Sequence, residues 1–528
     1  MSGSVPLVRQ LEGAPEPVEV AARFLDQPYL LFLDSAASGV GPSEPRALGR
    51  YSFVAADPAV VVRSKGAVTE ILQDGTWRPV EADALGTMRR MLSDAQMEPV
   101  PGLPPFQGGA AGYIGYDYGG VLERIPPTRY DDLALPDVVL GLYDWVIAWD
   151  HQLGTAWIVS LGVPGCGPER AERAKKRLDA VSARIFAPAS RFATSSRFAT
   201  SSRANARDLA DGFPTPAGKI PRVAGHEGAL LSGSQPAPSY PVTSTDAAIA
   251  IGLRSTFTHR GYLDAVGRVR EYIVAGDIFQ ANLSQRFHAP LREAPFELYR
   301  RLRTRNPAPF AAYLGFDDVT VLSASPERFL RLDHERQVET RPIKGTRPRG
   351  LAPMHDAALG RALAESEKDR AENVMIVDLL RNDLSRVCRP GTVRVPELFA
   401  LEQHPTVHHL VSTVVGELEP SADAVDLVRA AFPGGSITGA PKVRAMEIIA
   451  ELEPTRRKVY CGSIGYLSAT GAMDTSIVIR TLVATGGEVY FQAGGGIVAD
   501  SDPELEYRET LDKARGLIEA LRGDGEKA

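Results

Sequence analysis

Short apolar stretches separated by turns dominate the first part of the chain. Residues 29–33, 60–63, 138–142 and 156–161 are rich in β-branched and aromatic side chains, and turn-forming residues separate them. Side chains of these types favour strands. The pattern therefore predicts a sheet-rich first lobe over residues 1–186.

Helical spacing of apolar residues appears after residue 256. Apolar side chains recur every three or four positions over 262–275, which predicts a helix that ends at Gly276. The same spacing predicts a second helix over 357–380 and a third that begins near Lys442.

Strands follow these helices. The β-rich runs 476–482 and 488–492 predict two strands separated by glycine-rich turns. The second lobe, 256–522, is thus expected to mix α and β structure, with a short tail at 523–528. Its motifs fall at helix ends and in loops, where functional residues are often found.

The composition of residues 187–255 differs from that of both lobes. Ser, Ala, Pro, Gly and Arg dominate there, and Ser-Arg-Phe-Ala-Thr occurs twice in tandem, at 190–194 and 196–200. Such a stretch buries too little apolar surface to offset the entropy lost on ordering. It is expected to be a mobile insertion.

Overall composition indicates a globular protein with a small-molecule site. Among 528 residues, 44% are hydrophobic and 23% are charged, which is typical of soluble domains. A formal charge of -6 offers no general attraction to nucleic acid or to an anionic membrane. Three widely spaced cysteines and a start without an apolar signal segment predict a reducing compartment, the cytoplasm.

The basic segment 341–350 contains one residue that can bond covalently to an electrophilic carbon, Lys344. An amine attacks only without its proton, so a nucleophilic lysine needs burial or nearby cations, and Arg341, Arg347 and Arg349 are such cations. The Pro and Gly residues of the segment are equally typical of a solvated loop. Both interpretations stay open from these residues alone.

Two acidic pairs lie one helical turn apart, Asp369 with Glu372 and Glu506 with Glu509. Residues at this spacing share a helix face, so the four carboxylates could bind a hard cation such as Mg²⁺. Basic neighbours could instead make both pairs solvated surfaces.

Two glycine-rich segments could bind an anion. Residues 434–442 lead into the third predicted helix, whose free amides and nearby hydroxyls could hold a carboxylate. Residues 494–496, three glycines after a predicted strand, could turn successive N–H groups toward an anion. Each run is equally typical of a tight turn.

Three other groups are ambiguous by themselves. His408 and His409 begin a short apolar run that predicts a strand, and alternation would send their imidazoles to opposite faces. Glu327, within Ser-Pro-Glu-Arg-Phe, could be a salt-bridged turn residue or a general acid.

Taken together, the motifs of the second lobe closely resemble those of the chorismate-utilising enzymes. They are Gly-Asp-Ile-Phe-Gln-Ala-Asn-Leu at 276–283, Ser-Pro-Glu-Arg at 325–328, Pro-Ile-Lys-Gly-Thr at 342–346, Ala-Glu-Asn-Val-Met-Ile-Val-Asp at 371–378, Gly-Ser-Ile-Thr-Gly-Ala-Pro-Lys at 435–442, Asp-Thr-Ser-Ile-Val-Ile-Arg at 474–480, Ala-Gly-Gly-Gly-Ile-Val at 493–498 and Glu-Tyr-Arg-Glu-Thr at 506–510. The first lobe resembles the amino-terminal part of anthranilate and aminodeoxychorismate synthases more loosely, through residues 31–35 and 49–53. This resemblance implies an α+β fold in which two antiparallel sheets face each other with helices outside.

Two positions separate branches of the family. Anthranilate synthases carry alanine at the position of Lys344, whereas aminodeoxychorismate synthases carry lysine, so this chain resembles the latter. Isochorismate and salicylate enzymes use a lysine at position 280 to activate water, and the neutral amide of Gln280 cannot do so. Asp369 stands where anthranilate synthases carry glutamate.

The resemblance also implies a role for each site residue. Lys344 attacks C2 of chorismate while Glu327 protonates the departing C4 hydroxyl, and ammonia then adds at C4. Catalytic roles are implied for Lys344, Glu327, His409 and Gln280, substrate binding for Arg480, Tyr460, Ser436, Gly494, Gly495, Gly496 and Lys513, Mg²⁺ binding for Asp369, Glu372, Glu506 and Glu509, and a tryptophan pocket for Leu33, Asp34 and Ser35.

A partner is implied as well. The chain shows no Cys-His glutaminase, because Cys388 has no nucleophile elbow around it, so ammonia is expected from a separate glutamine amidotransferase subunit or from free ammonium. The product would lead to 4-aminobenzoate and folate. Two alternatives are anthranilate synthase component I and a non-catalytic regulator that binds chorismate or tryptophan.

Overall fold

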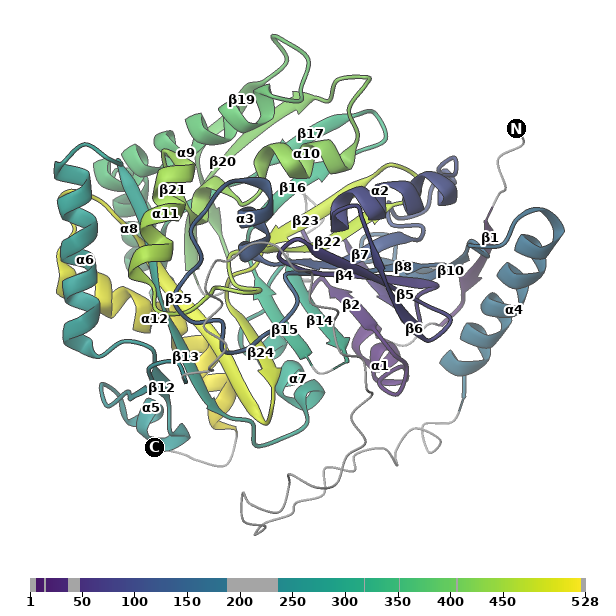
Figure 1. Ribbon diagram of the computed structural model, residues 1–528, viewed down its shortest axis with the longest axis horizontal. Helices are drawn as coiled ribbons and strands as arrows, with labels where there is room; N and C mark the ends of the chain where they lie inside the picture. Colours follow the sequence, from purple (N-terminus) through teal and green to yellow (C-terminus); the bar gives the residue numbers. More distant parts are fainter. Residues whose placement is uncertain are drawn as a thin grey trace, which may run out of the picture.

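The structure is a computed structural model. It describes residues 6–13, 16–36, 48–187, 236–317, 319–350, 352–404 and 407–523. Figure 1 shows the arrangement of its helices and strands.

Two large sheets form the centre of the molecule, and neighbouring strands in both are antiparallel. Within the described residues, the first sheet has 13 strands in the order β1 (Leu7–Leu11), β10 (Thr155–Ser160), β9 (Trp145–Asp150), β3 (Tyr51–Ala55), β2 (Leu30–Asp34), β14 (Phe310–Phe316), β15 (Val319–Ser325), β24 (Thr481–Thr485), β25 (Glu488–Ile497), β13 (Gln280–Pro290), β12 (Arg254–Ser255) and β11 (Tyr240–Pro241), with β21 (Gly439–Ala440) beside β13. The second has 12 strands over the same part of the chain, in the order β18 (Ile343–Pro348), β20 (Val407–Glu417), β17 (Gln337–Thr340), β16 (Arg328–Leu332), β23 (Met473–Ile477), β22 (Ser463–Ser468), β7 (Gly109–Ile114), β8 (Val138–Tyr143), β4 (Val60–Lys65), β5 (Val68–Gln73) and β6 (Thr76–Val80), with β19 (Arg394–Gln403) beside β20.

Both halves of the chain contribute to both sheets. In the first sheet, β2 from the first lobe pairs with β14 from the second. In the second sheet, β7 pairs with β22 in the same way. The two sequence lobes are therefore continuous through hydrogen-bonded strands.

Aromatic side chains from the two sheets pack against each other. The ring of Phe53 on β3 lies 5.5 Å from that of Tyr466 on β22, and Phe106 stacks on Tyr466 at 4.7 Å. All three side chains are buried. Because one ring comes from each sheet, the contact shows that the sheets face each other across a shared core, which confirms the expected α+β fold.

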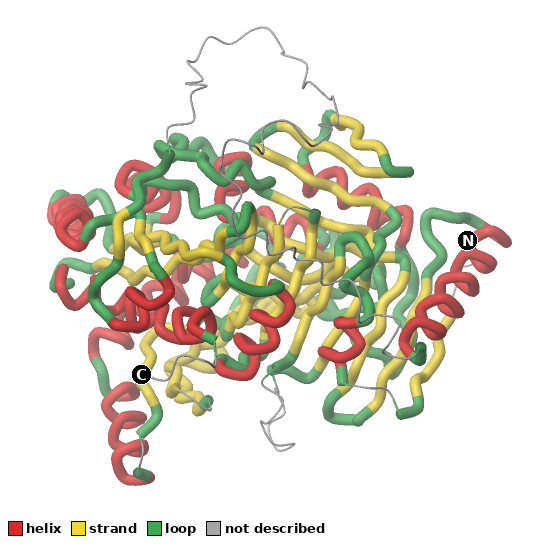
Figure 2. The backbone as a smooth tube through the Cα atoms, turned by 90° about the horizontal axis from the view of Figure 1, so that it is seen from below, coloured by secondary structure: helices red, strands yellow, loops and turns green. Residues whose placement is uncertain are grey.

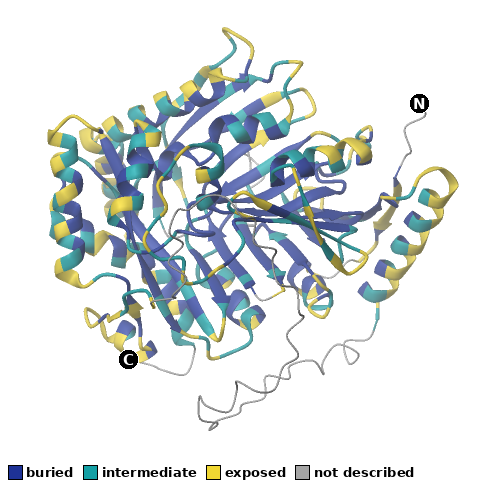
Figure 3. Ribbon diagram, viewed as in Figure 1, coloured by how far each residue is buried: buried dark blue, intermediate teal, exposed yellow. Residues whose placement is uncertain are grey.

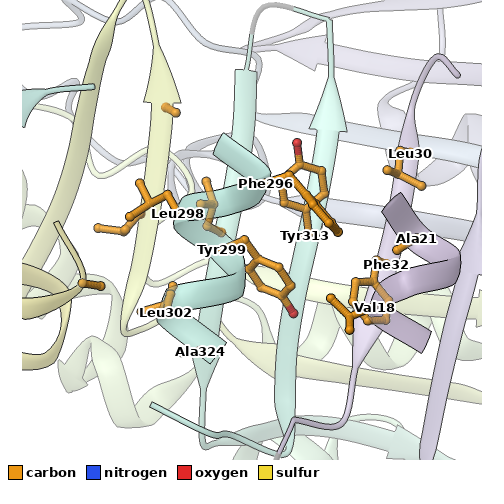
Figure 4. Close-up of a cluster of buried hydrophobic side chains, with 14 of the residues drawn as sticks. Val18, Ala21, Leu30, Phe32, Phe296, Leu298, Tyr299, Leu302, Tyr313 and Ala324 are labelled. Atoms are coloured by element: carbon orange, nitrogen blue, oxygen red, sulfur yellow. The ribbon is translucent and has the colours of Figure 1, made fainter. Parts of the chain in front are cut away.

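Helices cover the outer faces of the sheets (Figures 1 and 2). They are α1 (Pro17–Ala22), α2 (Ala84–Ala95), α3 (Gly119–Leu122), α4 (Gly167–Ile185), α5 (Asp246–Ile251), α6 (His259–Val274), α7 (Pro295–Arg305), α8 (Pro353–Ala364), α9 (Glu367–Ser385), α10 (Ala424–Ala431), α11 (Lys442–Leu452) and α12 (Pro503–Arg522), with short 3-10 turns η1 (Tyr116–Tyr118) and η3 (Gly435–Ile437). In Figure 4, α7 places Phe296, Tyr299 and Leu302 against the first sheet, where α1 adds Val18 and Ala21. Figure 3 shows the consequence: strands are mostly buried, and exposed residues gather on the outer helix faces.

The predicted helix boundaries are partly right. The helix at 262–275 is confirmed as α6, which Thr258 caps by accepting from the Gly261 amide, and the helix near Lys442 is confirmed as α11. The single helix predicted over 357–380 is wrong, because α8 ends at Ala364 and α9 begins at Glu367. Ser366 divides them by capping α9.

Two strand predictions need correction. The run 476–482 is divided between β23 and β24, and Arg480 between them adopts a left-handed conformation with φ of 52°. The run 488–492 is the start of the longer strand β25, which continues through residues 494–496 because all three glycines pair with β13. They are strand residues, so the predicted turn after a strand is wrong.

The end of the predicted insertion is also folded. Residues 240–255 form β11, α5 and β12, and Ala248, Ile251 and Leu253 join the core beneath the first sheet. The mobile insertion therefore cannot extend to residue 255 as predicted. The tandem repeats at 190–200 lie outside the described residues. Across the described helices, none is long and apolar enough to cross a membrane.

Candidate active site

Lys344 lies on β18 with its side chain directed toward β25. Its Nζ is 3.3 Å from the position that a Cβ on Gly496 would occupy. The charge of its amine acts on the carboxyl groups of Glu327, Glu372 and Glu509. Among the described residues, this amine has no hydrogen bond or ion pair. The side chain is partly buried and turned toward the predicted acidic cluster.

The three arginines around Lys344 each have an acidic partner elsewhere. Their ion pairs are Arg341 with Glu402, Arg347 with Asp369 at 2.8 Å, and Arg349 with Asp356 at 2.7 Å. Each of these cations is therefore balanced by a carboxylate, and their action on the lysine stays a prediction. The partners come from β19 and from the start of α8 and α9, so the local sequence did not reveal them.

Glu327 is a buried carboxyl group between β15 and β16. The Ser436 hydroxyl donates to its Oε1 at 2.7 Å. Burial raises the pKa of Glu327 to about 7, although the Ser436 hydrogen bond and the Lys344 charge pull it downward. A carboxyl with this pKa holds its proton over much of the range near neutrality and can donate it.

His409 on β20 is a neutral imidazole near neutral pH. Burial lowers its pKa to about 3, and the charges of His404 and Arg480 act in the same direction. Its Nδ1 lies 2.9 Å from the Thr346 hydroxyl, which fixes the ring beside the Lys344 segment. His408 has a different partner, since its Nε2 lies 2.8 Å from Asp356 Oδ1.

The three glycines of β25 make room for the groups around them. A Cβ on Gly496 would lie 2.0 Å from Gln280 Nε2, and a Cβ on Gly495 would lie 3.0 Å from Glu506 Oε2 and 3.3 Å from Glu509 Oε1. A Cβ on Gly494 would lie 2.3 Å from the Leu283 carbonyl oxygen. Glycine is thus required for close approach, which brings the acids of α12 and the amine of Lys344 to adjacent residues of one strand.

Gln280 occupies the start of β13 and is buried. Its Oε1 has no hydrogen-bond partner among the described residues, although a buried amide oxygen normally has one. The side-chain amide that carries this oxygen lies next to Gly496, which also adjoins the Lys344 amine. It can accept a hydrogen bond from a molecule bound at this position.

The α12 acids show how a cation could be held. Glu506 is buried, accepts from the Ser501 hydroxyl at 2.6 Å through Oε1, and leaves Oε2 without a partner among the described residues. Burial raises its pKa, and the nearby charge of Glu509 raises it further. Burial alone would raise the pKa of Glu509 too. The Lys513 amine, 2.6 Å from Glu509 Oε1, instead keeps this pKa below its usual range.

The α9 acids differ from each other. Burial raises the pKa of Glu372, and the charges of Asp369 and Glu509 raise it too, so the acids of the two helices are close enough to interact. Asp369 Oδ2 is bound by Arg347. No three acidic, histidine or cysteine side chains of the described residues form a metal-binding group in this conformation. The oxygen donors of Glu372, Glu506 and Glu509 fit a hard cation, whereas Asp369 is committed to an ion pair.

Arg480 is a partly buried cation at the site. Among the described residues, its guanidinium has no hydrogen bond or ion pair, and burial lowers its pKa. Its charge acts on His409 and on the Tyr460 hydroxyl. Lys513 is a second cation at the site and donates to the Gly494 carbonyl at 2.9 Å. Both can bind substrate carboxylates.

The predicted tryptophan residues lie apart from this site. Leu33, Asp34 and Ser35 line a cavity of about 400 Å³ between the sheets, together with Phe53 and Tyr466. The Asp34 carboxylate is held by Arg303 at 2.7 Å and by the Tyr299 hydroxyl at 3.0 Å. Arg328, which follows Glu327 in the sequence, also lines the cavity.

Some supporting residues escaped the sequence analysis. Ser501 holds Glu506, Thr346 holds His409, and Arg457 with Glu453 forms a buried pair behind Ser436. For the last pair a signal exists in the sequence, because a glutamate and an arginine four residues apart at a helix end often pair. The others are single hydroxyls: the partner of Thr346 is distant in the sequence, and Ser501 lies in the irregular segment just before α12.

Known proteins resemble this chain over most of its length. The family model for chorismate binding enzymes matches residues 44–519. Aminodeoxychorismate synthase component 1 of Salmonella typhimurium is 42% identical over 473 residues, which is 89% of this chain and 90% of the relative. Anthranilate synthase component 1 of Cereibacter sphaeroides is 38% identical over 90% of this chain and 87% of the relative. The crystal structure of anthranilate synthase component I from Streptococcus pneumoniae superposes with a TM-score of 0.70 at 29% identity, covering 91% of this chain and 95% of that one.

Proposed function

This chain belongs to the chorismate-binding enzyme family, and we propose from that premise that it is component 1 of an aminodeoxychorismate synthase. Its reaction replaces the C4 hydroxyl of chorismate by ammonia and gives 4-amino-4-deoxychorismate. One observation carries the assignment: the Lys344 amine lies next to Gly496, among the carboxyl groups of Glu327, Glu372 and Glu509. A lysine at this point supplies the site with its own nucleophile.

In the first displacement, the Lys344 amine loses its proton to solvent, and its free nitrogen then bonds to C2 of the ring. Both double bonds of the ring diene shift, the C4–O bond breaks, and Glu327 gives its proton to the departing hydroxyl, which leaves as water. Glu327 is suited to this role because burial raises its pKa to about 7. The Lys344 nitrogen becomes positively charged when it bonds to C2. The ionised Glu327 then takes a proton from this nitrogen.

In the second displacement, ammonia bonds to C4 and the C2–nitrogen bond breaks. Both double bonds return to their first positions, and the Lys344 nitrogen leaves with a proton from the incoming ammonium group. Two allylic displacements thus put nitrogen on the carbon that lost the hydroxyl. Gln280 cannot activate water as a base, which favours ammonia as the nucleophile.

Binding groups hold the ring for these steps. We assign the two substrate carboxylates to Arg480, Lys513 and the amides around Gly494–Gly496, because both cations lie at the site and Arg480 has no acidic partner among the described residues. His409, a neutral imidazole, faces the ring as a hydrogen-bonding group. Tyr460, whose side chain is buried close to Arg480, closes the pocket. These residues lie within 256–522, which we propose as the catalytic lobe.

Mg²⁺ is the proposed cofactor. Glu372, Glu506 and Glu509 would hold it, since their oxygens are hard ligands and Glu506 Oε2 has no partner within the described residues. Bound Mg²⁺ would neutralise the ring carboxylate and orient the substrate. Asp369 would not bind the metal directly, because its carboxylate forms the ion pair with Arg347.

The name component 1 of the relatives implies a second component. We propose that the partner is a glutamine amidotransferase that releases ammonia for C4, and that free ammonium at alkaline pH can replace it. We also propose that the cavity beside Leu33 and Ser35 is the counterpart of a tryptophan pocket, since Phe53 and Tyr466 supply aromatic walls.

Product analysis tests the function. The purified chain, given chorismate, Mg²⁺ and an ammonium salt at alkaline pH, should form 4-amino-4-deoxychorismate, identified by mass spectrometry. Anthranilate synthase component I is the competing assignment, because such enzymes are 37–40% identical to this chain. Fluorescent anthranilate as the product would establish that alternative, and chorismate binding without turnover would establish a regulator.

A further inference from the structure

Arg457 is among the largest fully buried side chains of the molecule, with 2% of its surface exposed. It follows α11 and is paired with Glu453, which is also buried. Arg457 Nε donates to Glu453 Oε2 at 2.9 Å, and Nη2 donates to Oε1 at 2.6 Å. A two-pronged pair of this kind is strong and fixes the plane of the guanidinium.

The remaining N–H groups of Arg457 reach two segments of the proposed active site. Nη1 donates to the carbonyl oxygen of Ile437 at 3.0 Å, and Nη2 donates to the carbonyl oxygen of Asn282. Ile437 follows Ser436, whose hydroxyl is bonded to Glu327. One planar group therefore joins the Ser436 segment to β13, where Gln280 lies two residues before Asn282.

Other contacts fix the pair itself. The Ser284 amide and hydroxyl both donate to Glu453 Oε1 at 2.8 Å. The Arg457 guanidinium carbon lies 4.6 Å from the ring centre of Tyr116 and 5.8 Å from that of Tyr460. Such contacts leave the guanidinium a single arrangement, and a lysine ammonium could not reproduce its planar fork.

We propose that Arg457 and Glu453 are positioning residues for proton donation by Glu327: the pair holds the Ser436 segment so that its hydroxyl stays bonded to the Glu327 carboxyl. The pair touches no reacting atom. This inference rests on the proposed function, because it concerns the acid that protonates the C4 hydroxyl.

Steady-state kinetics of Arg457→Lys test the proposal. At a constant concentration of free NH₃, kcat should fall by roughly 30-fold, while the KM for chorismate changes by less than about threefold. The wild-type kcat should fall as pH rises through the pKa of Glu327. The fall of kcat at high pH is called the alkaline limb here. Because the Ser436 hydrogen bond lowers the pKa of Glu327, losing that hydrogen bond should raise this pKa and move the alkaline limb to higher pH.

Two further variants keep the test decisive. Ser284→Ala removes one donor from Glu453 with little change in volume, and it should give a smaller loss of kcat with a limb shift of the same sign, even if Arg457→Lys does not fold. The matched control is Arg286→Lys, which alters a second buried arginine, located on β13 and bound to Asp132 at 2.9 Å. It should leave kcat and the alkaline limb unchanged.

A purely structural pair would give a different result. Arg457→Lys and Ser284→Ala would then lose folded protein, while kcat per folded molecule and the position of the alkaline limb stay at wild-type values. That outcome overturns the proposal. If the wild-type chain fails to aminate C4, the proposed function fails instead, so the two failures are distinguishable.

Discussion

Replacing Glu327 by glutamine should stabilise the protein at alkaline pH while removing its activity. The carboxyl is buried, and burial raises its pKa from 4.5 to about 7. A glutamine has nearly the same shape, can still accept from the Ser436 hydroxyl, and never carries the buried charge. The substitution should therefore trade catalysis for stability, a common property of active-site acids.

The size of the expected gain in stability follows from the difference between the pKa of Glu327 in the folded and unfolded states. A difference of about 2.5 units at about 1.4 kcal/mol per unit gives roughly 3 kcal/mol. The sign follows from proton binding. Since the folded state holds this proton more tightly than the unfolded state, the carboxyl favours folding at low pH and loses that contribution as pH rises from about 4.5 through about 7.

Denaturant unfolding at several pH values measures this effect. We expect Glu327→Gln and wild type to differ little in free energy of unfolding at pH 5, and the variant to be more stable by up to about 3 kcal/mol at pH 8. Glu271→Gln is the control, because its side chain is 64% exposed and should show no such pH dependence. A stability difference that is the same at pH 5 and pH 8 would refute the reasoning.

Three further predictions concern the site. Lys344→Ala should lower C4 amination by roughly 10³-fold with a KM for chorismate near wild type, because the binding groups remain; unchanged turnover in the ammonium-dependent assay would remove the lysine from the mechanism. Gly496→Ala should lower kcat by more than about 10²-fold, because its Cβ would meet Gln280 Nε2 at 2.0 Å, whereas Gly267→Ala, on α6 with open space around it, should keep full kcat. Glu506→Gln should raise the Mg²⁺ concentration needed for half-maximal activity by at least about tenfold, and a titration curve matching wild type would exclude Glu506 from the metal site.

The sequence was most informative where local chemistry decides the structure. Apolar runs predicted the positions of β4 and β8, and helical spacing predicted α6. Motifs also identified Lys344, Glu327 and the glycines of β25, which the fold brings together from separate elements. The arrangement of the sheets came from family resemblance, since periodicity alone predicted only a mixture of α and β structure.

The errors arose where distant partners decide the structure. The sequence did not show the acidic partners of the arginines near Lys344, because those acids lie on other elements, such as Glu402 on β19. The glycines at 494–496 looked like a turn because the pairing with β13 is a long-range contact. One error had a local cause. Ser366 between α8 and α9 is an N-cap residue, a signal that is present in the sequence but that the spacing of apolar residues does not detect.

The central claim is that the Lys344 nitrogen bonds to the ring of chorismate. Mass spectrometry of the protein after incubation with chorismate and Mg²⁺, without ammonia, tests it most directly. The account predicts a covalent adduct with the mass of chorismate less one water, mapped by peptide analysis to Lys344 and absent from Lys344→Ala. An enzyme that aminates chorismate but forms no such adduct, or forms it equally in the alanine variant, would contradict the account.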